Sequence, residues 1–87
     1  MAIEVSGPPA AEAIIHALRE SILQELPGAE VEVEGGGGHF MIRVISQAFE
    51  GKGAVDRQRL VYKAITPLMA GEGAPVHAID KMTCQTP

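Results

Sequence analysis

The spacing of the apolar residues predicts a helix in the first third of the chain. Apolar side chains recur there every three or four residues, which is the spacing of one helix face: Ile15, Leu18, Ile22 and Leu26. Pro8-Pro9 suits a first helical turn, where the missing N–H costs no hydrogen bond, and Pro27-Gly28 is a stop signal. A first helix is therefore expected between these two signals.

The apolar period then changes from helical spacing to two, which is typical of strands. Val31 and Val33 alternate with Glu30, Glu32 and Glu34, so a half-exposed strand with an acidic outer face is predicted. The glycines of residues 35–38 form a turn. The next run, residues 40–45, is apolar on both faces except at Arg43, which favours a central strand paired antiparallel to the first.

The second half of the chain predicts a loop, a helix and a last strand. Residues 49–53 hold two glycines and are expected to be a loop. A helix follows from Val55 to Met69, bent or weakened by Pro67, with a buried stripe of Val61, Ile65 and Leu68. Residues 76–79 are β-prone and are predicted as the third strand, and residues 80–87 as the start of a further helix.

The predicted element order is α-β-β-α-β, an α+β fold with a three-stranded mixed sheet. Because a helix joins the second and third strands, these two should lie parallel in one sheet. A chain of 87 residues is expected to form one domain over residues 1–87. Its core is expected to be modest, because a chain this small buries only roughly 60–65% of its unfolded surface.

Composition and charge narrow the function classes. No apolar run is long enough for a membrane helix, residues 1–4 lack the basic start of a signal peptide, and the chain has one cysteine, so a cytoplasmic protein is expected. Through Ile42 the chain has seven acidic and one basic residue, and from Arg43 onward six basic and four acidic residues. The net charge of −4 disfavours nucleic-acid binding by the whole chain, although the second half has a weakly basic character.

Two histidines are the strongest candidates for chemistry. His39 is expected at the start of the second strand and His77 near the start of the third, and parallel neighbours begin at the same edge of a sheet about 4.8 Å apart. Neutral imidazole is a common metal ligand, but tetrahedral metal sites take four ligands. The missing ligands would come from a partner or a small molecule. The alternative is that both are solvated polar residues, as is expected for His16 on the first helix.

The other reactive residues favour simpler interpretations. Gly51-Lys52-Gly53 precedes a helix but lacks the phosphate-loop spacing, so a helix cap is the better interpretation. Cys84 has no neighbouring base or second cysteine and is expected to be inert rather than a redox or ligand thiol. No serine has a nucleophile-elbow context and no carboxylates pair in a cleft, so the chain is not expected to be an enzyme. A basic face would use four residues, Lys52, Arg57, Arg59 and Lys63.

Several segments together resemble the BolA family. These are residues 39–46, 49–52, 57–62 and 76–79, followed by Thr83 and Thr86-Pro87, in the order and spacing of that family. The short glycine turn leading into His39 is similar to the IbaG-type branch. The resemblance implies the BolA fold, which is like a type II KH domain, with a three-stranded mixed sheet backed by helices.

The resemblance also implies a function. BolA proteins are partners of monothiol glutaredoxins and share a [2Fe–2S] cluster with them in iron–sulfur trafficking or iron sensing. The glutaredoxin cysteine and glutathione hold one side of the cluster, a histidine matching His77 is a ligand on the other, and His39 is the candidate for the fourth position. Two alternatives stay open: a DNA-binding transcriptional regulator using the basic second helix, and a metal-free interaction module that forms a homodimer.

Overall fold

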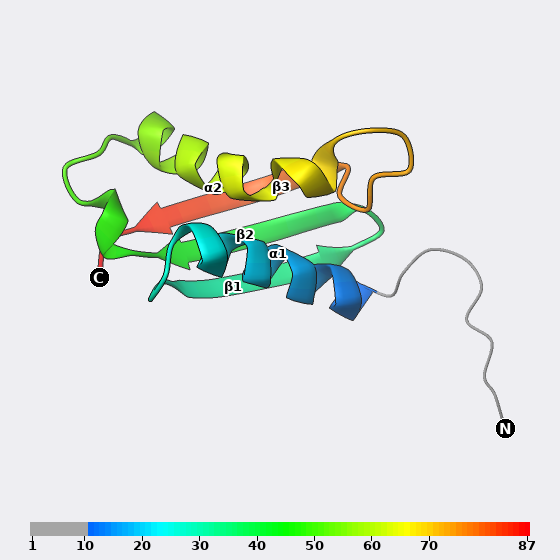
Figure 1. Ribbon diagram of the computed structural model, residues 1–87, viewed down its shortest axis with the longest axis horizontal. Coiled ribbons are helices and arrows are strands. Elements are labelled where there is room, and N and C mark those ends of the chain that lie inside the picture. The colour runs from blue at the N-terminus through cyan, green and yellow to red at the C-terminus, as the bar shows by residue number, and fades with distance from the viewer. Residues whose placement is uncertain (1–10) are drawn as a thin grey trace, which may run out of the picture.

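The computed structural model describes residues 11–87 (Figure 1). Its two helices and three strands follow one another in the predicted order, α-β-β-α-β. They are α1 (Ala11–Glu25), β1 (Glu30–Gly36), β2 (His39–Ile45), α2 (Ala54–Met69) and β3 (Ala78–Gln85), with a short 3-10 helix, η1 (Gln47–Phe49), after β2. No helix within residues 11–87 is long and apolar enough to cross a membrane.

The sheet has the order β1-β2-β3, with β2 in the centre. β1 pairs antiparallel with β2, and β2 pairs parallel with β3. Both pairing directions confirm the prediction. A tight turn joins the first two strands, which makes them antiparallel, and a helix joins the last two, which allows them to be parallel. The sequence therefore determined which strand ends share an edge.

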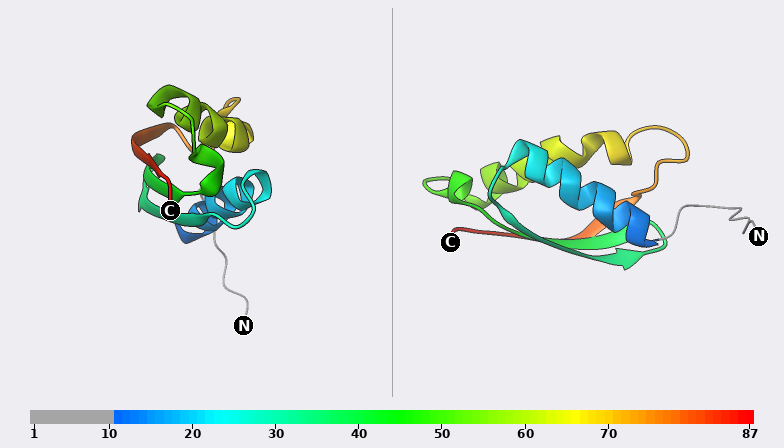
Figure 2. Two further views of the ribbon diagram at one scale, coloured as in Figure 1. Left: turned by 90° about the vertical axis from the view of Figure 1, so that its left-hand side faces the viewer. Right: turned by 60° about the horizontal axis from the view of Figure 1, so that its bottom comes forward.

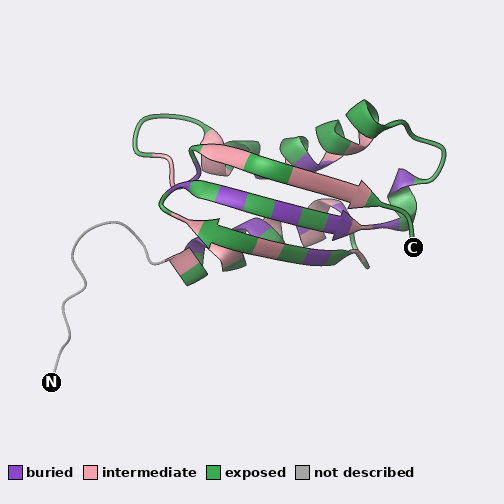
Figure 3. Ribbon diagram, turned by 180° about the vertical axis from the view of Figure 1, so that it is seen from behind, coloured by how far each residue is buried: buried purple, intermediate pink, exposed green. Residues whose placement is uncertain are grey.

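Both helices pack on one face of the sheet, and the described chain leaves the other face open (Figures 2 and 3). Along β2, Phe40, Ile42 and Val44 are buried, whereas Met41 and Arg43 are exposed. The predicted central position of β2 is confirmed, but the described chain covers only one of its two faces. Met41, 40% exposed, is an apolar residue on the open face.

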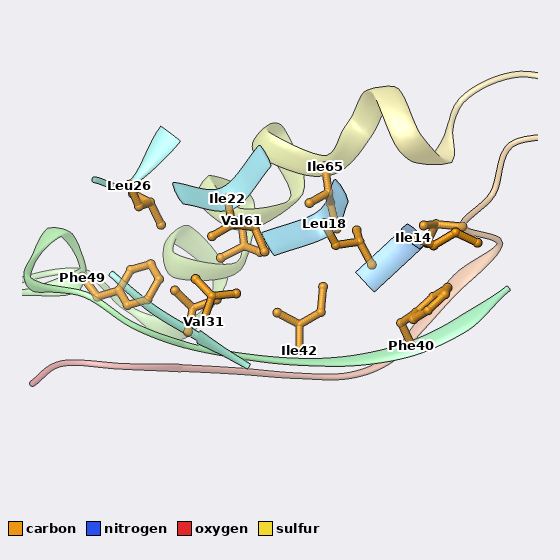
Figure 4. Close-up of a cluster of buried hydrophobic side chains, with 12 residues drawn as sticks. Ile14, Leu18, Ile22, Leu26, Val31, Phe40, Ile42, Phe49, Val61 and Ile65 are labelled. Atoms are coloured by element: carbon orange, nitrogen blue, oxygen red, sulfur yellow. The ribbon is translucent and has the colours of Figure 1, made fainter. Parts of the chain in front are cut away.

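The core lies between the two helices and the covered face of the sheet (Figure 4). Its fully buried members come from α1, β2, η1, α2 and the segment before β3, and include Leu18, Ile22, Phe40, Val44, Phe49, Val61, Ile65 and Val76. On α1 the buried stripe begins at Ile14, whereas the predicted Ile15 is only partly buried. Leu68 is also only partly buried.

β3 is the element that the sequence predicted least well. The strand runs from Ala78 to Gln85, so the predicted strand at residues 76–79 was too early and too short, and the helix expected from residue 80 is wrong. An irregularity between Phe40 and Met41 leaves Asp80 as an extra residue opposite β2. This bulge places two exposed residues in succession, Asp80 and Lys81, and so interrupts the alternation that identifies a strand.

Three boundaries also differ from the prediction. β1 continues to Gly36, so the turn comprises only Gly37 and Gly38 of the four glycines. Phe49, expected in a loop, lies in η1 and is fully buried. The predicted helix start at Pro8-Pro9 lies outside the described residues.

Candidate functional site

The turn before β2 and the segment before β3 meet at one end of the sheet, on the right in Figure 1. The carbonyl oxygen of Gly38 accepts hydrogen bonds from the backbone N–H of His77, at 2.8 Å, and of Ala78, at 3.1 Å. His77 is therefore the last residue before β3 rather than part of the strand. These two bonds hold the backbone of His77 against the start of β2.

Gly38 also makes room for the imidazole of His77. A Cβ atom built on Gly38 would lie 2.6 Å from Nδ1 and 2.8 Å from Cγ of His77, far closer than non-bonded atoms approach. Gly38 has a positive φ of 85°, which glycine adopts without strain. Glycine is the residue that both adopts the positive φ of this turn and leaves space for the imidazole of His77.

The two histidines lie side by side, as the parallel pairing predicts. Their ring centroids are 6.5 Å apart, with an angle of 80° between the ring planes, and both residues are exposed. Two imidazoles bound to one metal through bonds of about 2 Å have ring centroids roughly 5–6 Å apart. The separation of the two rings is therefore close to the distance that a shared metal requires.

His39 has a polar partner that sequence reasoning missed. Its Nδ1 lies 3.1 Å from a carboxylate oxygen of Asp80, the extra residue of the β3 bulge. A carboxylate only accepts hydrogen bonds, so this contact is a hydrogen bond when Nδ1 carries a ring proton. No sequence signal distinguishes Asp80 from other exposed acids, because its position depends on the bulge.

The donor set fits half of the ligand set that the BolA resemblance implies. Two imidazole nitrogens are the ligands that one iron of a Rieske-type [2Fe–2S] cluster takes from its protein. Within residues 11–87, no three His, Cys, Asp or Glu side chains come close enough together to hold a metal ion. If the two imidazoles bind a metal, the remaining ligands would have to come from outside residues 11–87.

The four basic candidates for nucleic-acid binding are mostly engaged within the protein. Arg57 donates to the backbone carbonyls of Lys52, at 2.8 Å, and Cys84, at 3.3 Å. Arg59 pairs with Asp56 at 3.6 Å on the same helix, and Lys63 pairs with Glu25 of α1 at 3.5 Å. Each acidic partner offsets positive charge that a phosphate would otherwise meet.

Cys84 and His16 stand apart from the histidine pair. Cys84 is a free, half-buried thiol on β3. Burial raises its pKa above the usual value, and the nearby Arg57 guanidinium opposes that rise only in part. A thiol with a raised pKa is a poor nucleophile at neutral pH. His16 is exposed on α1, as predicted.

Comparisons with known proteins agree with the fold and with the motifs. The family model described as BolA-like protein matches residues 11–87. A protein of Acinetobacter guillouiae, described as an uncharacterized protein in the rpoN-murA intergenic region, is 39% identical over 62 residues, covering 71% of this chain and 72% of that protein. BolA-like protein 1 of Mus musculus is 34% identical over 84 residues, covering 85% of this chain and 59% of the mouse protein. The chain thus spans less than two thirds of the mouse relative.

A solved structure is also similar. The BolA domain of SufE1 from Arabidopsis thaliana has a TM-score of 0.72 and 31% identity, covering 86% of this chain and 93% of that domain. It shares the arrangement of two helices on a three-stranded mixed sheet. The order of elements, the residues that match the family motifs and the extent of the family match lead to one conclusion: the chain belongs to the BolA family.

Proposed function

We propose that this protein is a non-enzymatic adaptor that binds a monothiol glutaredoxin and shares a [2Fe–2S] cluster with it, for iron–sulfur trafficking or iron sensing. The observation that carries the proposal is the exposed pair of His39 and His77, with ring centroids 6.5 Å apart. The pair presents two nitrogen donors at the end of the sheet, where a second protein can reach them. The partner's cysteine and a glutathione thiolate would complete the ligand set.

The two histidines are expected to contribute unequally. The backbone of His77 is held by the Gly38 carbonyl, and its ring lies against the bare α-carbon of Gly38. The side chain of His39 is 57% exposed and has one hydrogen bond, to Asp80. His77 is therefore the better ordered donor, and its loss should affect the shared site more.

The test combines the apo-protein with glutathione and a cluster-loaded monothiol glutaredoxin. Visible absorption and circular dichroism should change on mixing, and a complex containing both proteins should elute from gel filtration. His77→Ala should alter the spectrum most and His39→Ala less. His16→Ala removes an exposed imidazole that lies on α1 rather than at a strand start, and is the matched control that should behave as the unchanged protein.

Two results would contradict the proposal. One is an unchanged spectrum of the mixture together with separate elution of the two proteins. The other is a new spectrum that survives the loss of both His39 and His77, because the cluster would then be held by other residues.

A further inference from the structure

We propose that Asp80 is a positioning residue of this site, which holds His39 in the Nδ1–H tautomer and thereby presents Nε2 as the metal-binding nitrogen. The inference rests on the proposed function for its biological meaning. The interaction itself belongs to the protein alone and can be measured without a partner.

The first observation is the bulge in β3. β2 and β3 pair in register from His39 with Ala78 to Phe40 with Ile79, and then again from Met41 with Lys81, so that Asp80 has no partner on β2. Bulges re-aim side chains and are frequent next to functional sites. Here the Asp80 carboxylate on β3 lies 3.1 Å from Nδ1 of His39 on the neighbouring strand β2.

The second observation is that both side chains of the contact are largely exposed. The side chains of His39 and Asp80 are 57% and 55% exposed. Exposed pairs of this kind typically contribute little to folding stability, because water competes for both groups. An effect of Asp80 on the orientation of His39 can therefore be separated from an effect on the fold.

The tautomer of His39 matters because a histidine binds a metal through its unprotonated ring nitrogen. A ligating imidazole usually donates its other ring N–H to a carboxylate or carbonyl, which fixes the tautomer and ring orientation and increases ligand basicity. A histidine side chain free in water prefers the opposite tautomer, with the proton on Nε2. Asp80 reverses that preference, so that the lone pair on Nε2 is available before the metal arrives.

The decisive experiment is 15N NMR of the imidazole side chains of the apo-protein at about pH 8, where a free imidazole is neutral. In the unchanged protein, His39 should show a protonated Nδ1 and an unprotonated Nε2. In Asp80→Ala the proton should move largely to Nε2. Asp56→Ala removes an exposed carboxylate from α2 with the same change in charge, and should leave His39 unchanged.

A second arm measures the cluster-loaded complex with glutaredoxin and glutathione. Loss of an outer hydrogen-bond partner typically lowers metal affinity 10–100-fold, so Asp80→Ala should release the cluster correspondingly more readily than Asp56→Ala. The part of the circular dichroism that His39→Ala removes should also weaken in Asp80→Ala.

The outcomes separate this inference from the proposed function. A proton on Nε2 of His39 in the unchanged protein, or an Asp80→Ala spectrum identical to it, overturns the role of Asp80 even if the cluster complex forms. If no cluster complex forms with the unchanged protein, the proposed function fails. The tautomer measurement alone then decides whether Asp80 positions His39.

Discussion

At the scale of single residues, Gly38 controls the position of His77. Its carbonyl bonds the backbone of His77 and Ala78, and its α-carbon faces the His77 ring. Gly38→Ala should displace the ring and weaken cluster sharing, in addition to a cost of about 1–2 kcal/mol for a left-handed backbone. The loss is measured by urea unfolding and by the dichroism of the glutaredoxin complex.

Gly37 offers a matched control for that substitution. It also has a positive φ, 62°, but an added Cβ would meet nothing within 4 Å. Gly37→Ala should therefore lower stability similarly while leaving cluster sharing intact. Equal loss of cluster sharing in both variants would show that the turn, and not the fit of the His77 ring, is what matters.

Cys84 is expected to react slowly at neutral pH. Burial raises the pKa of Cys84, so the protonated thiol dominates in the folded protein at neutral pH, and only the thiolate attacks an alkylating reagent. Alkylation by iodoacetamide should be much slower for the folded than for the urea-unfolded protein. Fast labelling of the folded protein would contradict this.

The same raised pKa makes stability depend on pH on the alkaline side. Below about pH 8.5, the usual pKa of a thiol, the thiol is protonated in both states and has no effect. At higher pH the unfolded chain ionises first, since the folded pKa of Cys84 is raised, so the free energy of unfolding should fall. Cys84→Ala should remove this part of the decline, which denaturant titrations at several pH values would measure.

At the scale of elements, the short helix η1 anchors the connection between β2 and α2. Ser46 caps it by accepting a hydrogen bond from the backbone N–H of Ala48, at 3.1 Å, and Phe49 is fully buried. Phe49→Ala should cost about 3–5 kcal/mol, because it leaves a large cavity. Phe49→Leu should cost about 1 kcal/mol and keep the protein folded if the alanine variant does not fold.

An exposed apolar residue nearby is the control for Phe49. Val55, in the first turn of α2, is 61% exposed, so Val55→Ala should change stability by less than about 0.5 kcal/mol. Denaturant unfolding followed by circular dichroism measures all three variants. A cost at Val55 equal to that at Phe49 would show that burial is not the cause.

The helices and the first two strands could be predicted because their apolar periods are uninterrupted. Ile65 and Val61 on α2, and Val31 on β1, lie where the helical and alternating patterns place them. β3 could not be predicted over its full length, because the bulge at Asp80 shifts the alternation by one residue. The phase of a strand after a bulge depends on its pairing with a neighbour, which is a tertiary property.

At the scale of the whole molecule, charge bears on the DNA-binding alternative. The net charge is −4, and Arg59 and Lys63 pair with acidic side chains. We therefore expect only weak, sequence-independent DNA binding that is lost between about 50 and 200 mM salt. Fluorescence anisotropy with labelled duplex DNA measures this. A complex that persists at the higher salt and is weakened by Lys63→Ala would favour the regulator instead.

As a whole, residues 11–87 leave one face of the sheet open and the histidine pair exposed. Both helices cover the same side of the sheet (Figures 2 and 3). His39 and His77 lie where β2 and β3 begin, and both are exposed. Since no further donor from residues 11–87 joins the pair, the proposed function requires a second molecule. The exposure of the two histidines would give that second molecule access to the site.

The element order, the parallel pairing of β2 and β3, and hence the approach of His39 to His77 could all be predicted from the sequence. These follow from periodicity and from the helical connection, which are local in the chain. The fit of the His77 ring against Gly38 and the contact of Asp80 with Nδ1 of His39 became visible only in the folded structure. Both contacts join residues far apart in the sequence through the strand register and the bulge, and no local pattern records either.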